Sequence, residues 1–111
     1  MVNYYFEKIK DIVKNNGKMV GVIGLSYREG VKEKAYSRSI AMIRLLKKKG
    51  YEVYGLDPLY SKEEIENNFN VRYLSDFGKM NAIIVMNKLP EYKGKLMKIK
   101  NRVVDVKNML K

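Results

Sequence analysis

Three polar residues that could bind an anion follow a short apolar run near the start of the chain. Ser26, Tyr27 and Arg28 come just after residues 20–23, whose apolar and mostly β-branched side chains predict a buried strand. In open α/β sheets, ligands bind outside the carboxyl ends of the strands. A guanidinium there can pair with phosphate oxygens, at about 1.5–3 kcal/mol for each charge-assisted hydrogen bond. The pattern predicts an anion site at Arg28, with a surface Arg beside a half-buried Tyr as the structural alternative.

The glycines of this stretch form neither of the standard phosphate-binding loops. Gly21 and Gly24 lack the Gly-x-Gly-x-x-Gly spacing of a dinucleotide site, and Val31 stands where a Walker lysine would follow Gly30. Close packing of a helix on the strand is the favoured role of Gly21 and Gly24, and a turn is the favoured role of Gly30. Binding of NAD or ATP through a glycine-rich loop is therefore not predicted.

Hydrophobic periodicity predicts an amphipathic helix over residues 3–14, followed by strands that alternate with helices. Ser37 or Ser39 could cap a helix that ends at Gly50, and Ser61 could cap another. The predicted strands are residues 20–23, 51–56, 71–74, 81–86 and 102–106, and the further helices are residues 62–67 and 89–100. This order predicts an α/β, Rossmann-like three-layer fold, with a mostly parallel sheet of about five strands preceded by an N-terminal helix.

Composition narrows the function classes. The chain has 111 residues, 23 Lys+Arg against 12 Asp+Glu, a net charge of +11, and neither Cys nor His. The length suits one domain, and the missing Cys and His exclude a disulfide framework, a thiolate metal site and the commonest general base. No apolar run approaches the ~20 residues of a membrane span and no signal-peptide pattern is present, so a soluble, cytoplasmic protein is expected. The positive charge predicts attraction to anions, although solvated helix faces also explain the lysine clusters.

Four motifs in one order carry a resemblance to a known family. Residues 24–31 are Gly-Leu-Ser-Tyr-Arg-Glu-Gly-Val, and Ser37 precedes a helix that ends in Lys-Lys-Lys-Gly at residues 47–50. Residues 54–58 are Tyr-Gly-Leu-Asp-Pro, and residues 103–108 are Val-Val-Asp-Val-Lys-Asn. Over residues 18–111 the chain resembles the C-terminal, UDP-binding domain of the UDP-glucose/GDP-mannose dehydrogenase family.

The resemblance implies a substrate-gripping module of an NAD-dependent nucleotide-sugar 6-dehydrogenase, in which Tyr27, Arg28 and Lys107 would hold the nucleotide diphosphate of a UDP- or GDP-sugar. Such enzymes oxidise a primary alcohol to a carboxylate through two hydride transfers to NAD and a thiohemiacetal on a cysteine. Because this chain has no cysteine and no dinucleotide loop, an N-terminal domain outside it would supply the nucleophile and most of the NAD site. No catalytic or metal-binding residue is assigned here, and the chain alone is not assigned as an enzyme.

The resemblance also divides the chain. Residues 1–17 resemble the end of the helix that joins the two domains of the family and contributes to dimerisation, which implies a homodimer of the full enzyme. Residues 18–111 resemble the nucleotide-sugar-binding domain. The aromatic side chains of residues 4–6 would then be partly exposed in the isolated chain, or they pack on their own domain.

Several positions depart from the family pattern. Ala35 stands where the family has an Arg that reaches the phosphates of the cofactor, and Lys34 or Arg38 could substitute for it. Arg28 replaces a Lys and Lys107 replaces an Arg, which keeps the charge and changes the geometry of the contact. Asp57 could accept a ribose hydroxyl, although Asp-Pro is also an ordinary turn, which is favoured. Asp105 is expected to be structural.

Two other classes of function stay open. The charge of +11 and the interleaved Tyr and Lys residues suit a basic nucleic-acid-binding module, which is disfavoured because no recognition motif is present. A stand-alone interaction or regulatory subunit is the other alternative, with the first helix docking a separate partner.

Overall fold

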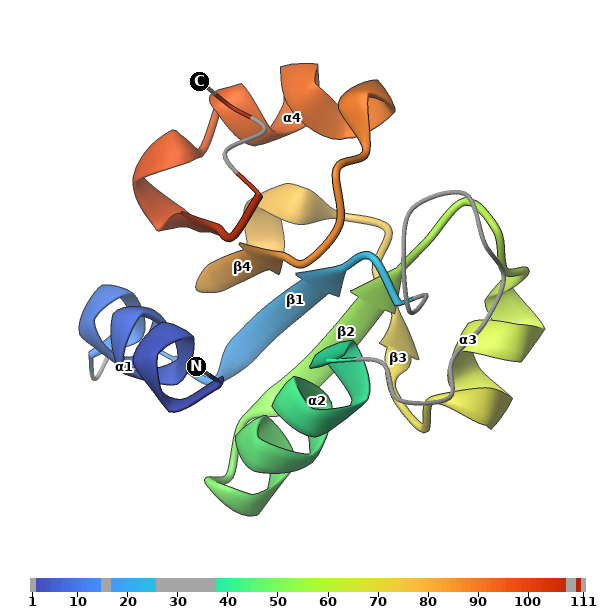
Figure 1. Ribbon diagram of the computed structural model, residues 1–111, viewed down its shortest axis with the longest axis horizontal. Helices are drawn as coiled ribbons and strands as arrows, with labels where there is room; N and C mark the ends of the chain where they lie inside the picture. The colour runs from blue at the N-terminus through green and yellow to red at the C-terminus, as the bar shows by residue number, and fades with distance from the viewer. Residues whose placement is uncertain (1, 15–16, 26–37, 108–109, 111) are drawn as a thin grey trace.

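The computed structural model describes residues 2–14, 17–25, 38–107 and 110. In this part of the chain, five parallel strands form one sheet in the order β3-β2-β1-β4-β5 (Figure 1). The strands are β1 (Met19–Ile23), β2 (Glu52–Leu56), β3 (Arg72–Tyr73), β4 (Ala82–Val85) and β5 (Val103–Asp105). The predicted α/β, Rossmann-like fold with an N-terminal helix is confirmed.

Helices cover both faces of the sheet because the central strands are apolar on both faces. Val20, Val22 and Ile84 face a core that also contains buried side chains of α1 (Val2–Val13), α2 (Arg38–Lys48) and α3 (Lys62–Asn68). Ile23 and Ile83 face a second core, which contains Leu96 of α4 (Lys93–Met97) and Phe77 of the 3₁₀ turn η1 (Phe77–Lys79). Alternate residues of a strand point to opposite faces, so β1 and β4 each contribute to both cores.

The first helix buries one stripe, as its spacing predicts. Phe6, Ile9 and Val13 are buried against the sheet, Tyr5 is half-buried, and Tyr4 is 60% exposed. The two expectations for the N-terminal aromatic residues are therefore each met in part. Phe6 packs on its own domain, whereas Tyr4 keeps a surface that this domain does not cover.

The ends of α2 and α3 follow local chemistry. Gly50, with φ of +91°, takes the left-handed conformation after α2, and its N–H donates to Lys47 O at 3.0 Å. The Ser61 hydroxyl accepts from Glu64 N at 3.1 Å, while the Glu64 carboxylate accepts from Ser61 N at 2.9 Å. This capping box confirms the predicted start of α3.

The continuous helix predicted over residues 89–100 is wrong. The segment divides into η2 (Pro90–Tyr92), α4 and η3 (Lys100–Arg102), and Ile99 N donates to Leu96 O in the i→i+3 pattern. Pro90 lacks an N–H group, and Gly94 lowers the helix propensity in the middle of the segment, so short 3₁₀ turns flank the helix.

Four strands are shorter than predicted. β2 begins at Glu52, β3 spans only Arg72–Tyr73, β4 spans Ala82–Val85, and β5 begins at Val103 because η3 takes the preceding residues. Short outer strands leave few unpaired backbone groups at the edges of the sheet. None of the helices in the described ranges is long and apolar enough to span a membrane.

Candidate functional site

The carboxyl ends of four neighbouring strands meet at one edge of the sheet. The last ladder bonds run from Gly24 N to Leu56 O (2.9 Å), from Met86 N to Ile23 O (2.8 Å) and from Val106 N to Val85 O (3.2 Å). The residues that follow these bonds therefore lie at one level, which we call the carboxyl edge: Leu25, Asp57, Asn87 and Lys107.

The order of the strands reverses between β1 and β4, in the middle of this edge. The chain leaves β1 for α2, which packs on one face of the sheet, and leaves β4 for α4, which packs on the other face (Figure 1). In doubly wound sheets, ligands bind outside the carboxyl ends of the strands, where the connections diverge in this way. We call this position, beside the ends of β1 and β4, the crevice, and it is the candidate site.

All of the buried polar side chains in the described part of the chain lie at the carboxyl edge. Ser39, Asp57 and Asn87 are 2%, 2% and 5% exposed, and they belong to the start of α2, the end of β2 and the end of β4. A buried polar group is costly unless it is hydrogen-bonded, so each of these side chains needs a partner. Two of these partners are backbone groups beside the crevice.

Asp57 joins the ends of β1 and β2. Its Oδ2 accepts from Leu25 N at 2.7 Å, and its Oδ1 accepts from Leu59 N at 2.9 Å. The second bond closes a turn two residues long, which is the favoured interpretation of Asp-Pro at this position. The first bond spans 32 residues of sequence and fixes the backbone where the chain leaves β1.

Ser39 ties the start of α2 to the same point. α2 begins at Arg38, so Ser39 lies inside its first turn, and its hydroxyl donates to Gly24 O at 2.5 Å. The prediction that Ser39 caps this helix is wrong, because the hydroxyl serves the carbonyl at the end of β1 instead. Ser37, the other predicted cap, lies outside the described residues.

Gly24 and Gly21 allow close approach, but not of a helix as predicted. Gly24 has φ of +92°, and a Cβ there would lie 2.8 Å from Asn87 N. A Cβ on Gly21 would lie 3.0 Å from the Leu74 side chain and 3.3 Å from that of Ile83. These neighbouring side chains belong to other strands of the sheet and to the loops that follow them, and not to a helix. At both glycines, the strands and their loops therefore come closer than the helices do.

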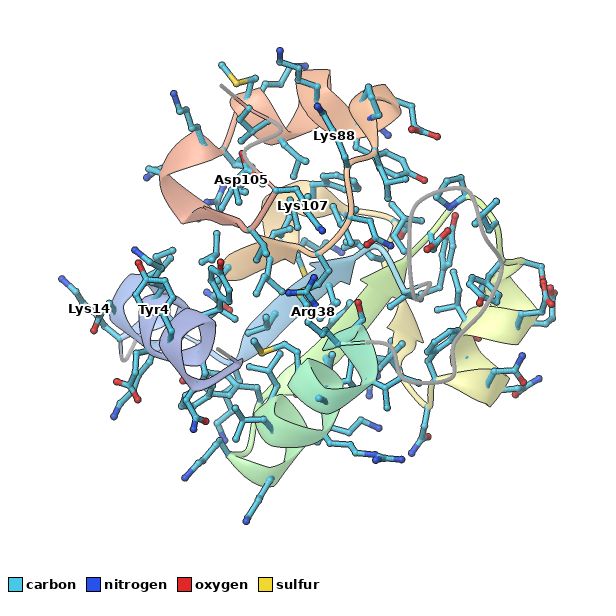
Figure 2. All side chains as sticks on the ribbon, viewed as in Figure 1. Tyr4, Lys14, Arg38, Lys88, Asp105 and Lys107 are labelled. Atoms are coloured by element: carbon cyan, nitrogen blue, oxygen red, sulfur yellow. The ribbon has the colours of Figure 1, made fainter. Side chains whose placement is uncertain are left out.

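Basic side chains flank the crevice. Figure 2 labels Arg38 at the start of α2 and Lys107 just after β5. Arg38 is exposed and Lys107 is half-buried. Lys88, one residue beyond Asn87, is also exposed and is drawn pointing away from the other two (Figure 2). The sequence analysis considered Arg38 only as a substitute for the family Arg, and it did not consider Lys88. Both could have been found from the sequence, because Lys88 follows a predicted strand and Arg38 follows the loop after one.

The other predicted site residues divide between the described and the undescribed parts of the chain. Tyr27 and Arg28, like Gly30 and Ala35, lie outside the described residues. Asp105 is half-buried, and its Oδ2 accepts from Leu110 N at 2.8 Å, which agrees with the expected structural role. Of the residues predicted to bind substrate, Lys107 is therefore the one that the structure brings to the carboxyl edge.

The described residues do not fit a complete NAD site. In dinucleotide folds, an acidic residue after the second strand binds a ribose hydroxyl. Asp57 occupies that place, but it is 2% exposed and both of its oxygens accept backbone N–H groups. Within the described ranges, no cluster of three acidic side chains could bind a metal ion, and the sequence contains no His or Cys. The polar groups at this edge are mainly backbone, amide and cationic groups.

Comparison with known proteins agrees with this geometry. The sequence model for the UDP binding domain of the UDP-glucose/GDP-mannose dehydrogenase family matches residues 21–111. The chain belongs to this family. A relative in Methanocaldococcus jannaschii, an uncharacterized protein, is 35% identical over 71 residues, which are 63% of this chain and 8% of that protein.

Solved structures of dehydrogenases share the fold of this family member. A UDP-glucose dehydrogenase from the hyperthermophilic archaeon Pyrobaculum islandicum matches 96% of the chain with a TM-score of 0.65 and 23% identity. A GDP-mannose dehydrogenase from Pseudomonas aeruginosa, solved as a ternary complex, matches 94% of the chain with a TM-score of 0.67 and 20% identity. The chain spans only 28% of the length of each of these two proteins.

Proposed function

We propose that this chain grips the nucleotide diphosphate of the substrate in an NAD-dependent nucleotide-sugar 6-dehydrogenase. The substrate would be a UDP- or GDP-sugar, bound at the crevice between β1 and β4. The chain would supply binding and orientation, and the reacting groups would come from elsewhere in the enzyme. Holding the nucleotide in one position makes the later hydride transfers effectively intramolecular, which is where such a module contributes to the rate.

The observation that carries the proposal is the set of buried polar side chains at the carboxyl edge. Asp57 and Ser39 use their side chains to fix Leu25 N and Gly24 O, the last described backbone groups before residue 26. A fold that needed only stability could place apolar groups there without the cost of burying a carboxylate. Fixing the backbone beside a crevice is instead what a binding site requires.

Three side chains are proposed as substrate contacts. Tyr27 would lie against the nucleotide, and Arg28 and Lys107 would pair with its phosphate oxygens, at about 1.5–3 kcal/mol for each charge-assisted bond. Lys107 stands just after β5, at the same edge of the sheet as Leu25. Support for Tyr27 and Arg28 comes from their place directly after the strand that ends beside the crevice.

The cofactor and the partner follow from the size of the chain. An N-terminal domain would bind NAD and supply the cysteine nucleophile. This chain has no cysteine, and it corresponds to 28% of the dehydrogenases with which it shares its fold. We propose that residues 1–17 form the end of the interdomain helix and contribute to a homodimer, and that residues 18–111 form the nucleotide-sugar-binding domain. A cytoplasmic location is proposed because a chain without cysteine needs no oxidising compartment.

An NMR titration of the 111-residue chain with UDP tests the proposal, with uridine and a short oligonucleotide as controls. UDP should shift the amide signals of residues 24–25, 57, 59, 87–88 and 105–107, and Arg28→Ala should weaken its binding. Uridine lacks the phosphates and should bind more weakly. Shifts only with the oligonucleotide, spread over the surface and abolished by salt, would replace the proposal with the nucleic-acid alternative.

A further inference from the structure

We infer that a hollow at the amino edge of the sheet, where the strands begin, binds one dianionic phosphate group. The hollow has a volume of about 320 Å³, near the lower end of the range of about 300–1,000 Å³ for small-molecule sites. We call it the lysine hollow, and it is lined by Lys14, Gly17, Lys18, Lys49, Gly50 and Tyr51. The inference does not depend on the proposed function, because the proposed substrate crevice lies at the opposite edge of the sheet.

The three lysines come from separate segments that meet where two helices end and two strands begin. Lys14 directly follows α1, and Lys49 directly follows α2. Lys18 directly precedes β1, and its carbonyl oxygen accepts from Glu52 N at 2.7 Å. This bond holds the starts of β1 and β2 side by side. Because the backbone around the hollow is fixed, a ligand has to order only the lysine side chains.

The positive charge at the hollow exceeds what the two helix ends require. The C-terminus of a helix carries about −0.5 of a charge, so the ends of α1 and α2 together contribute about −1. The three lysines that line the hollow contribute three positive charges, which leaves a surplus of about two. One phosphate group, with a charge of about −1.5 to −2 near neutral pH, matches this surplus better than a monoanion does.

The nearest carboxylates in the sequence do not line the lysine hollow. Asp11, three residues before Lys14, lines the hollow between α1 and β5, whereas Glu52 lines the hollow beside β2 and β3. In the described part of the chain, none of the three lysines forms an ion pair with a carboxylate. Their charge is therefore available to an anion from outside the chain.

The other walls leave room for an organic group attached to the phosphate. Tyr51 is half-buried, and its ring packs edge to face on Phe6 with the ring centroids 6.1 Å apart. Gly50 has no side chain, and the space where a Cβ would lie is open. The chemistry that the hollow recognises is a phosphate group, either as inorganic phosphate or within a small phosphomonoester.

Titration of the 111-residue chain with inorganic phosphate, AMP or acetate at constant ionic strength, followed by amide NMR signals, tests the inference. Lys14→Asn, Lys18→Gln and Lys49→Gln each remove one charge from the hollow, and asparagine suits residue 14 because its φ is +51°. Lys10→Gln and Lys48→Gln are the matched controls, since each removes an exposed lysine of the same two helices that does not line the hollow. Lys18→Arg keeps the charge and tests for rescue, and urea unfolding of each variant checks that it folds.

Phosphate should shift the amide signals of residues 14, 17–18 and 49–51. Its affinity should fall at least about 3-fold in each of the three hollow variants, because each removes a charge beside the ligand. The two controls should change the affinity less than about 1.5-fold, since more distant exposed charges are screened. Acetate should bind more weakly than phosphate, and Lys18→Arg should retain most of the affinity. Tighter binding of AMP than of phosphate would assign the site to a phosphomonoester, and equal affinities would assign it to phosphate itself.

Equal losses of phosphate affinity in the hollow variants and in the controls would overturn the inference, because a diffuse positive field would then explain the binding. Failure of the unmodified chain to bind phosphate at millimolar concentration, or equal affinities for acetate and phosphate, would also overturn it. The hollow variants should leave the shifts that UDP causes at residues 24–25 unchanged, so the proposed function is tested separately. UDP shifts confined to residues 14, 17–18 and 49–51 would support this inference and count against the proposed function.

Discussion

The two edges of the sheet are built differently. At the carboxyl edge, the buried side chains of Ser39, Asp57 and Asn87 reach across loops, and Asp57 alone accepts two backbone N–H groups. At the amino edge, a hollow of about 320 Å³ is lined by exposed lysines and a half-buried Tyr: Lys14, Lys18, Lys49 and Tyr51. Exposed lysines at helix ends also complement the helix dipole.

Side chains also bond to the backbone at the amino edge, where Arg102 donates to Met80 O at 2.9 Å. The amide oxygen of Asn81 accepts from Met19 N at 3.0 Å, and Asn81 is half-buried. It supports the entry into β1 from the adjacent strand. The comparison teaches that polar side chains stabilise the backbone at both edges. Among the described residues, however, the buried polar side chains all lie at the carboxyl edge.

Glycine substitutions give the largest expected contrast. In Gly24→Ala, the new Cβ would lie 2.8 Å from Asn87 N at a φ of +92°, so we expect the free energy of unfolding to fall by about 2–5 kcal/mol from strain and overlap together. Gly50→Ala at the amino edge has the same kind of φ, +91°, but no atom within 4 Å of the Cβ, so a loss of only about 1–2 kcal/mol is expected. Urea unfolding measures both values.

Gly94→Ala is the control for this series. Gly94 lies within α4 in open space, so alanine should stabilise the chain by about 0.5–1 kcal/mol through helix propensity. Equal losses of unfolding free energy in Gly24→Ala and Gly50→Ala would mean that the close approach of Asn87 does not exclude a side chain at residue 24. The two edges would then not differ in how tightly they are packed around these glycines.

Loss of Asp57 should cost more than loss of Asn81. Asp57→Ala leaves two N–H groups without their partner. The cost is about 1–3 kcal/mol for the buried Leu25 N and about 1 kcal/mol for the partly buried Leu59 N, so a total of about 2–4 kcal/mol is expected. Asn81→Ala removes one partner of a half-buried site and should cost about 1 kcal/mol. Equal losses in chemical denaturation would show that the carboxyl edge gains nothing from burial of its carboxylate.

Two serine variants separate stability from binding. Ser39→Ala removes the bond to Gly24 O, and Ser61→Ala removes the exposed cap of α3, so each should lower the free energy of unfolding by about 1 kcal/mol. Only Ser39→Ala should also weaken UDP binding, because it releases the backbone at the end of β1 beside the proposed site. An unchanged UDP affinity in Ser39→Ala would mean that this bond does not position the site.

The smallest expected effect concerns pH. Burial, followed by the charge of Glu91, raises the pKa of Tyr92 above its ordinary value of 10.0, and Asp57 contributes to the same field. The phenol therefore ionises first in the unfolded chain, so its contribution to stability is present below pH 10 and is lost as the pH rises from there through the folded pKa. As the pH is raised above 10, the urea midpoint should fall less for Tyr92→Phe than for the unmodified chain. The same pH dependence in both proteins would contradict this prediction.

Local chemistry explains why much of the fold could be predicted. The capping box of Ser61 and Glu64 and the left-handed Gly50 involve residues four or fewer apart, so their roles follow from neighbouring side chains. The apolar runs of β1 and β4 likewise predict strands buried on both faces. The division of residues 89–100 was missed because the apolar periodicity predicts one helix there and outweighed the opposing effects of Pro90 and Gly94.

The sequence by itself determined the alternation of strands and helices, the family resemblance and the presence of cations near strand ends, because periodicity and spacing are properties of neighbouring residues. Tertiary structure decided what the polar residues do. Asp57 bonds to a backbone group 32 positions away, and Ser39 bonds to one 15 positions away. Such partners become neighbours only when parallel strands come into register, so a side chain that looks like a helix cap or a ribose ligand in the sequence becomes a clamp on the backbone beside the crevice.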